Sequence, residues 1–95
     1  MIKLSENKIN EALENLNDWQ LSADKKSVSK SFKFVDFYHT MAFVNAVAWI
    51  ANQENHHPDM EIGYNYCHIK FITHSADGLT VNDFSCAMQV DLLGL

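Results

Sequence analysis

The chain has 95 residues, 47% of them hydrophobic, and a formal net charge of −5. This length and composition predict a single domain over residues 1–95 with one apolar core. The charge argues against nucleic acid as a partner, because a nucleic-acid surface needs clustered Lys and Arg. No apolar run approaches the ~20 residues that span a bilayer, and the N-terminus lacks a targeting segment. Cys67 and Cys86, without Cys-x-x-Cys spacing, indicate reduced, buried thiols in a cytoplasmic protein.

Helical spacing and turn signals define the first elements. Ser5 is the expected N-cap of a helix of about three turns that ends near Asn17. A short strand then begins with Trp19 and Leu21, and "SADKK" at 22–26 forms a turn. Residues 27–34 alternate as a half-buried strand. Its predicted inward face holds Val28, Phe32 and Phe34.

Asp36 is expected to cap a longer helix that stops before Pro58, which cannot continue it. The predicted apolar stripe of this helix is Phe37, Met41, Val44, Val47, Ala48 and Ala51. Strands follow at 59–64 and 67–73. Thr80-x-x-Asp83 resembles a capping box for a last helix that runs to about Leu93, with Phe84, Ala87 and Met88 inward. The order α-β-β-α-β-β-α predicts an α+β two-layer sandwich, a four-stranded antiparallel sheet with three helices on one face.

The last two strands allow a prediction of register. If Asn65-Tyr66 is a two-residue turn, Tyr64 faces Cys67. This register puts apolar partners on one face and a charge pair on the other, through the pairs Ile62–Ile69, Met60–Phe71 and Glu61–Lys70. It also pairs His68 with Gly63, and His57 with His74.

The stretch "NQENHHPDM" at 52–60 places two histidines at a helix end. Pro58 favours extended geometry at His57, whereas His56 can remain in the last helical turn, so the two rings can approach a ligand from different directions. The negative end of the helix dipole favours protonated histidine. Such a histidine can serve as a general acid.

Several interpretations of these histidines stay open. A solvated pair needs no function. Zinc needs ligands that converge tetrahedrally, which adjacent histidines diverging at a proline fit poorly. Nucleophilic catalysis by Cys86 lacks an obvious oxyanion hole and a GxSxG motif. Proton transfer on a small, neutral, polar ring compound suits several imidazoles without a nucleophile or cofactor motif. His39 and His68 are expected to be solvated, and core positions are expected for Phe32, Phe34, Phe37 and Phe43.

One motif links these residues: Asn52-x3-His56-His57-Pro58-x5-Tyr64-x9-His74-x8-Asp83. Trp19, "FKFVDF" at 32–37 and "THSADGLTVND" at 73–83 support it. With this motif, the chain resembles the pterin-4a-carbinolamine dehydratase family over nearly its whole length. The resemblance implies the same α+β fold and a hydro-lyase that needs no metal and no cofactor.

The implied reaction is dehydration of 4a-hydroxytetrahydropterin to quinonoid dihydropterin and water. It recycles the tetrahydrobiopterin used by aromatic amino-acid hydroxylases. The implied catalytic residues are His56, His57 and His74, with His57 on the hydroxyl and the other two as acid/base groups. Asp83 would orient a histidine or only cap its helix. The expected substrate-binding set is Asn52, Asn55, Thr73 and Asp83.

Asn52 departs from the family pattern, which commonly has Glu at this position. The change removes a negative charge that would favour a protonated histidine, and Glu54 lies on another face of the helix. Reduced activity or a shifted pH optimum is the expected consequence. The competing function is a weakly active or inactive member that serves as a protein-interaction cofactor, as animal relatives do for a homeodomain transcription factor. The resemblance also implies a homodimer or homotetramer.

Overall fold

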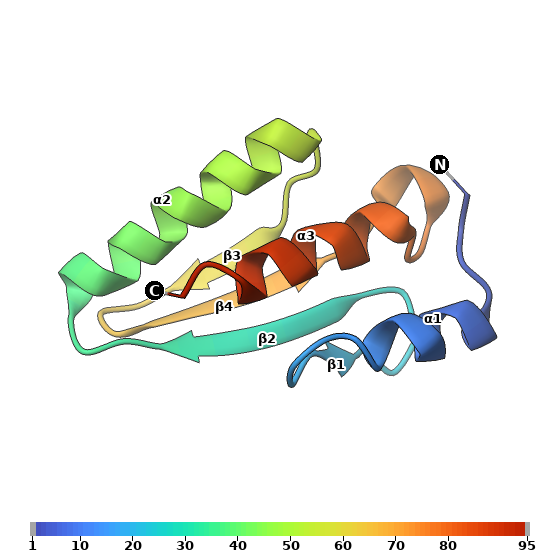
Figure 1. The fold of residues 1–95 in the computed structure, drawn as a ribbon, viewed down its shortest axis with the longest axis horizontal. Helices are drawn as coiled ribbons and strands as arrows, with labels where there is room; N and C mark the ends of the chain where they lie inside the picture. Colours follow the sequence, from blue (N-terminus) through green and yellow to red (C-terminus); the bar gives the residue numbers. More distant parts are fainter. Residues whose placement is uncertain (1, 95) are drawn as a thin grey trace.

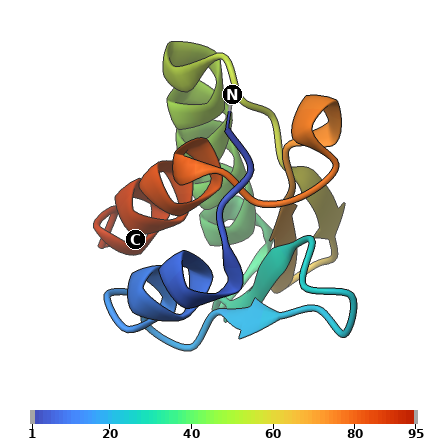
Figure 2. The same ribbon diagram turned by 90° about the vertical axis from the view of Figure 1, so that its right-hand side faces the viewer.

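A computed structural model describes residues 2–94, in which three helices cover one side of a four-stranded antiparallel sheet (Figures 1 and 2). The strand order in the sheet is β1-β2-β4-β3. The elements are α1 (Glu6–Leu13), β1 (Gln20–Leu21), β2 (Val28–Lys33), α2 (Phe37–Glu54), β3 (Asp59–Ile62), β4 (Tyr66–Phe71), a 3-10 turn η1 (His74–Ala76) and α3 (Val81–Asp91). The predicted fold class and element order are confirmed. None of the helices within 2–94 is long and apolar enough to cross a membrane.

Side-chain caps begin each α-helix as the sequence predicted. Ser5 and Asp36 each accept a hydrogen bond from the backbone amide three residues later. Thr80 and Asp83 form a reciprocal capping box at the start of α3. These caps satisfy backbone amides that have no partner inside the helix.

The first helix is shorter than predicted. It ends at Leu13 rather than near Asn17. The amides of Asn15 and Leu16 donate to carbonyls three residues back, so the chain tightens into a turn that still buries Leu16. The last helix ends at Asp91, two residues before the predicted end.

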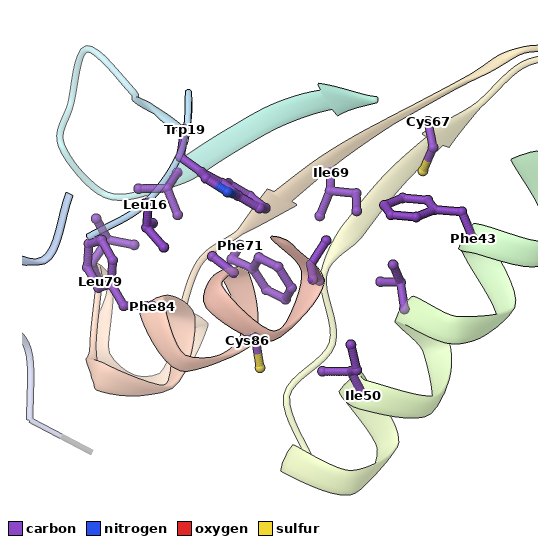
Figure 3. Close-up of a cluster of buried hydrophobic side chains, with 14 of the residues drawn as sticks. Leu16, Trp19, Phe43, Ile50, Cys67, Ile69, Phe71, Leu79, Phe84 and Cys86 are labelled. Carbon is purple, nitrogen blue, oxygen red and sulfur yellow. The ribbon is translucent and has the colours of Figure 1, made fainter. Parts of the chain in front are cut away.

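The core lies between the sheet and the helices (Figure 3). Both cysteines are free and buried, as predicted. Burial raises the pKa of the Cys67 thiol, and it is the main cause that raises the pKa of Cys86 to about 11. Fully buried hydrophobic side chains come from both layers: Val28, Val47, Cys67, Ile69, Phe71, Leu79, Cys86 and Ala87.

Three residues predicted to face the core are exposed: Phe37, Ala48 and Met88. On α2 the buried face starts one turn later, at Thr40, whose hydroxyl donates to the Tyr64 carbonyl at 2.9 Å. This hydrogen bond holds one face of α2 toward the sheet. The buried residues of that face are Thr40, Phe43, Val44, Val47, Ile50 and Ala51. On α3 the side chains that turn inward are Asp83, Phe84, Cys86, Ala87 and Val90.

The pairing of β3 with β4 corrects the predicted register. The turn is centred on Tyr64-Asn65, and the Gly63 amide closes it by donating to the Tyr66 carbonyl at 3.0 Å. The Tyr66 ring fills the space beside Gly63, so a larger residue there would clash. A two-residue slip leaves every side chain on the same face, which is why hydrophobic alternation did not detect it. The observed pairs are Asp59–Lys70, Met60–Ile69, Glu61–His68 and Ile62–Cys67.

Candidate active site

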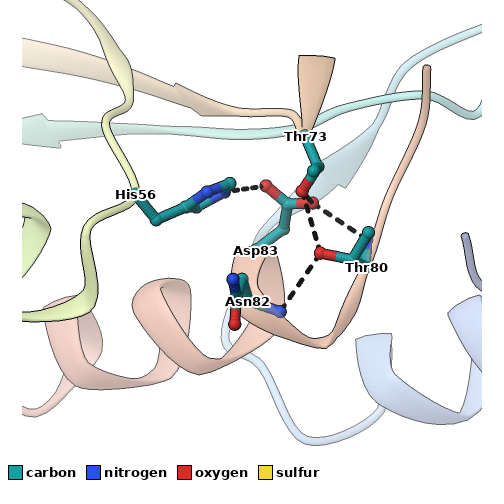
Figure 4. Close-up of polar contacts among 5 residues, drawn as sticks. All are labelled: His56, Thr73, Thr80, Asn82 and Asp83. Carbon is teal, nitrogen blue, oxygen red and sulfur yellow. Dashed lines mark hydrogen bonds and ion pairs between the residues drawn. The ribbon is translucent and has the colours of Figure 1, made fainter. Parts of the chain in front are cut away.

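A completely buried acidic side chain, Asp83, lies in the first turn of α3 (Figure 4). Its Oδ2 accepts the backbone N–H of Thr80 at 2.9 Å, which closes the capping box. The N-terminal end of a helix stabilises negative charge. Its other oxygen, Oδ1, lies 2.5 Å from Nε2 of His56.

The C-terminal end of α2 turns His56 back into the protein. Asn55 adopts the left-handed conformation, with φ 49°, and the His56 amide donates to the Ala51 carbonyl at 2.9 Å. This is a Schellman-type helix end. His56 is only 9% exposed, and its imidazole stacks nearly parallel to the Phe71 ring, with centroids 6.0 Å apart. The backbone turn therefore delivers one imidazole to the buried carboxyl of Asp83.

Thr73 joins the same network from the segment after β4. Its hydroxyl donates to Asp83 Oδ2 at 2.7 Å and lies 2.8 Å from the Thr80 hydroxyl. A two-way backbone bridge from Thr73 to Gly78 closes the η1 turn. Among residues 2–94, every buried side-chain nitrogen and oxygen has a hydrogen-bond partner. The site is thus a fully satisfied polar network inside an apolar core.

The predicted cross-strand pair of His57 with His74 is wrong. β3 begins at Asp59 and β4 ends at Phe71, so both histidines lie outside the ladder. Extending the observed register beyond the ladder brings His56, rather than His57, level with Thr73. His56 and Thr73 do both contact the carboxyl group of Asp83.

Exposed polar residues adjoin this network along the chain. Asn55 and His57 flank His56, and His74 follows Thr73 in η1. Asn52, one helical turn earlier on α2, is exposed as well. No group of three or more His, Cys, Asp or Glu within 2–94 is arranged to hold a metal ion. The arrangement offers one buried acid–imidazole pair with exposed imidazoles next to it in sequence, which suits proton transfer.

The other two histidines have local partners. His39 is exposed, as predicted, and its Nδ1 lies 2.6 Å from the Asp36 carboxylate. The backbone amide of His39, and next its ring, hold the pKa of Asp36 below its usual range. His68, which was also expected to be solvated, is half-buried, and its Nδ1 lies 2.7 Å from the Ser31 hydroxyl. Ser31 and His68 both line a polar hollow of about 300 Å³.

A family model described as pterin 4 alpha carbinolamine dehydratase matches residues 2–93. The chain belongs to this family. A Legionella pneumophila (strain Lens) protein is 54% identical over 91 residues, which is 95% of this chain and 80% of the relative. A Nitrosospira multiformis protein is 45% identical over 93 residues, 98% of this chain and 80% of the relative. Both relatives bear the provisional name pterin-4-alpha-carbinolamine dehydratase.

One solved structure agrees with this family membership, and a second shares the fold. A transcriptional coactivator/pterin dehydratase from Brucella melitensis superposes with a TM-score of 0.90 at 34% identity, covering 94% of this chain and 95% of the other. A pterin dehydratase-like RuBisCO assembly factor of the alpha-carboxysome shares the fold at 23% identity, with a TM-score of 0.69 over 81% of this chain and 89% of the other. The resemblance inferred from the sequence is confirmed.

Thr80 is a site residue that the sequence did not predict. The capping-box pattern identified it as a helix cap, which it is. Its contact with Thr73 joins residues that a turn and a loop separate. No local spacing rule signals that contact, because the turn between them sets the distance.

Proposed function

We propose that the chain dehydrates 4a-hydroxytetrahydropterin to quinonoid dihydropterin and water, with His56, His57 and His74 carrying the proton transfers. One observation supports this most strongly. Nε2 of the buried His56 lies 2.5 Å from Oδ1 of Asp83, and two members of this network, His56 and Thr73, are each followed in sequence by an exposed histidine, His57 and His74. A site with several imidazoles can both donate and accept protons near neutral pH.

The reaction needs two proton movements at adjacent atoms. The 4a-hydroxyl leaves as water after it gains a proton, and the neighbouring ring nitrogen loses one as the C=N bond forms. His57, which is exposed, contacts the hydroxyl. His56 and His74 act as acid/base groups on either side of the 4a-carbon, and Asp83 holds the His56 ring through its 2.5 Å contact.

Polar residues at the end of α2 bind the pterin in this proposal. Asn52 and Asn55 are exposed and carry amides that can donate and accept. Asn52 contributes no negative charge to the histidines. We therefore expect Asn52→Glu to shift the pH–rate profile upward, because a nearby carboxylate favours imidazolium. An unchanged profile would show that position 52 does not influence the acid/base groups.

A stopped-flow assay of carbinolamine dehydration tests the proposal. We expect the wild type to exceed the uncatalysed rate, and His57→Ala to lose about 100-fold or more of that gain. His39→Ala is the matched control, because His39 is also exposed but its ring bonds only to Asp36, at the start of α2. No rate gain by the wild type would overturn the proposed function.

The proposal extends to the setting of the reaction, which is cytoplasmic recycling of the pterin for an aromatic amino-acid hydroxylase. Two free, buried cysteines support a reducing compartment.

We also propose a homodimer or homotetramer. An apolar hollow of about 420 Å³ between α2 and α3, beside the exposed Trp49 and Leu92, supports it. A monomer in sedimentation experiments would contradict this part.

The same apolar hollow favours a second candidate function, that of a protein-interaction cofactor. Its lining residues include Ala46, Trp49 and Leu92. A partner protein that covers this surface would not need the histidines. Full biological function of a His57→Ala variant would therefore favour the interaction role over the enzymatic one.

A further inference from the structure

The hydroxyl of Thr73 lies between two other polar groups that are completely buried. Thr73 is 6% exposed, while Thr80 and Asp83 have no exposed surface. The Thr73 oxygen is 2.8 Å from the Thr80 hydroxyl and 2.7 Å from Asp83 Oδ2 (Figure 4). In such an environment each hydroxyl proton points at one defined acceptor, because leaving a buried donor or acceptor unpaired is unfavourable.

The direction of each bond follows from which groups can only donate. The backbone amides of Thr80 and Asn82 must donate, the first to Asp83 Oδ2 and the second to the Thr80 hydroxyl oxygen. Thr73 donates its own proton to Oδ2, so it accepts the proton of Thr80. A one-way chain of donors therefore runs from the first turn of α3 through two hydroxyls to one carboxyl oxygen, and such chains reinforce their members.

Two donors on Oδ2 determine where the remaining proton lies. With the Thr80 amide and the Thr73 hydroxyl both directed at it, Oδ2 has the role of an acceptor. The proton shared by Asp83 and His56 must then lie between Oδ1 and Nε2, which are 2.5 Å apart. That occupies one ring nitrogen of His56 and leaves Nδ1 as the nitrogen that can exchange protons with another molecule.

We propose that Thr73 is a positioning residue for the dehydration, acting through Asp83 to fix which nitrogen of His56 is available. This inference rests on the proposed function for its kinetic consequence. It also changes the role expected for Thr73 from the sequence, which was a contact to the pterin. The Thr73 proton is already committed to Asp83, so the side chain has no proton to give a substrate.

Two substitutions at Thr73 separate this role from packing. Thr73→Val keeps the shape and removes the hydroxyl, and Thr73→Ser keeps the hydroxyl. We expect Thr73→Val to lower kcat roughly 10-fold with KM nearly unchanged, the effect of one lost hydrogen bond to a charged group. Thr73→Ser should restore kcat close to the wild-type value.

Thr40→Val is the matched control. Thr40 is also completely buried, and its hydroxyl donates to the carbonyls of Asp36 and Tyr64. The Thr40→Val variant therefore loses as many side-chain hydrogen bonds as the Thr73→Val variant, but position 40 makes no hydrogen bond to Asp83. We expect Thr40→Val to lower the free energy of unfolding and to leave kcat unchanged.

Nitrogen-15 NMR of labelled histidine gives a readout independent of activity. In the wild type, Nε2 of His56 should have the chemical shift of a protonated nitrogen. In Thr73→Val, Asp83 loses a donor and becomes the stronger base, so the Nε2 shift should move toward the unprotonated value. Neither Thr73→Ser nor Thr40→Val should move it.

Each outcome decides the question. An unprotonated Nε2 in the wild type would overturn the inference even if Thr73→Val failed to fold. Wild-type kcat and NMR shifts in Thr73→Val would overturn it too, and a rise in KM alone would return Thr73 to the role of a substrate contact. If the wild type showed no dehydratase activity but the expected NMR shifts, the proposed function would fail and the hydrogen-bond assignment would stand.

Discussion

The two ends of α3 each carry a carboxyl group with little exposed surface that accepts several hydrogen bonds. At the N-terminal end, Asp83 meets His56, Thr73 and the Thr80 amide. At the C-terminal end, Asp91 accepts the indole N–H of Trp19 at 3.0 Å and the Lys30 ammonium at 2.8 Å. Their side chains are 0% and 10% exposed. Burial and hydrogen bonding alone therefore do not distinguish them.

The partner residues make the difference. The Lys30 ammonium has three donors and no acceptor, so beside Asp91 it is a permanent donor. The His56 imidazole can be a donor, an acceptor or both, so beside Asp83 a proton can move. The helix dipole adds to the contrast, because it favours a negative charge at the start of α3 and disfavours one at the end. Asp91 thus needs a fixed cation, and Asp83 does not.

The largest expected effect comes from Asp83→Asn. Two donors point at the Oδ2 position, so the amide oxygen must take that place and the NH2 group must face His56. His56 would then accept at Nε2 and carry its proton on Nδ1, the reverse of the proposed arrangement. We expect kcat in the dehydration assay to fall about 100-fold or more. Asp91→Asn is the matched control, and an equal loss in that variant would remove the distinction between the two carboxyl groups.

The next effect concerns stability at the other end of the helix. Asp91→Ala leaves the Lys30 ammonium and the Trp19 indole without their acceptor in a partly buried place. We expect the free energy of unfolding, measured by urea denaturation, to fall by about 3 kcal/mol. Dehydratase kcat at a temperature where the variant is folded should be unchanged. Glu11→Ala, an exposed member of a surface ion pair, should cost about 0.5 kcal/mol or less.

The element order and helix caps could be predicted because they depend on neighbouring residues. Ser5, Asp36 and the Thr80–Asp83 box bond to amides within three positions along the chain. The face of α2 that packs on the sheet was only partly predictable. Phe37 fits the apolar stripe of a helix as well as Phe43 does. The hydrogen bond from Thr40 to the Tyr64 carbonyl orients the helix so that Phe43 is buried and Phe37 is exposed.

The candidate site could be predicted as a set of residues but not as a geometry. The motif brought His56, His57, His74 and Asp83 together in one hypothesis, and the structure shows a contact between two of them. The bend that buries His56 depends on a left-handed residue, Asn55, which the sequence argument had placed at the substrate. The strand register also escaped prediction, because alternation fixes the face of a side chain and not its partner.

A smaller effect is expected from the backbone that delivers His56 to Asp83. Asn55 has φ 49°, where residues with a Cβ are disfavoured and glycine is not. Asn55→Ala should lower the free energy of unfolding by about 1 kcal/mol, and Asn55→Gly should be close to neutral. These two substitutions also separate a substrate-binding role of the Asn55 side chain from a backbone role. If Asn55→Gly keeps its stability and raises KM, the side chain binds the pterin, whereas wild-type kinetics would assign it to the backbone alone.

The smallest effect uses Cys86, which lies on α3 between the two carboxyl groups. Burial first, and then the negative charges of Glu54 and Asp83, raise the pKa of this thiol to about 11. Since the usual value is 9.0, the folded state holds the thiol proton longer than the unfolded state, and stability falls as pH rises from 9 toward 11. In a Cys67→Ala background, carbon-13 NMR of cysteine labelled at Cβ would follow Cys86 alone, without the signals of the three tyrosines. Asp83→Asn should lower this midpoint because it removes one of the charges, and Asp91→Asn should leave it unchanged. Equal midpoints in the wild type and Asp83→Asn would mean that Asp83 carries no negative charge, and the proton would then belong to the carboxyl group rather than to His56.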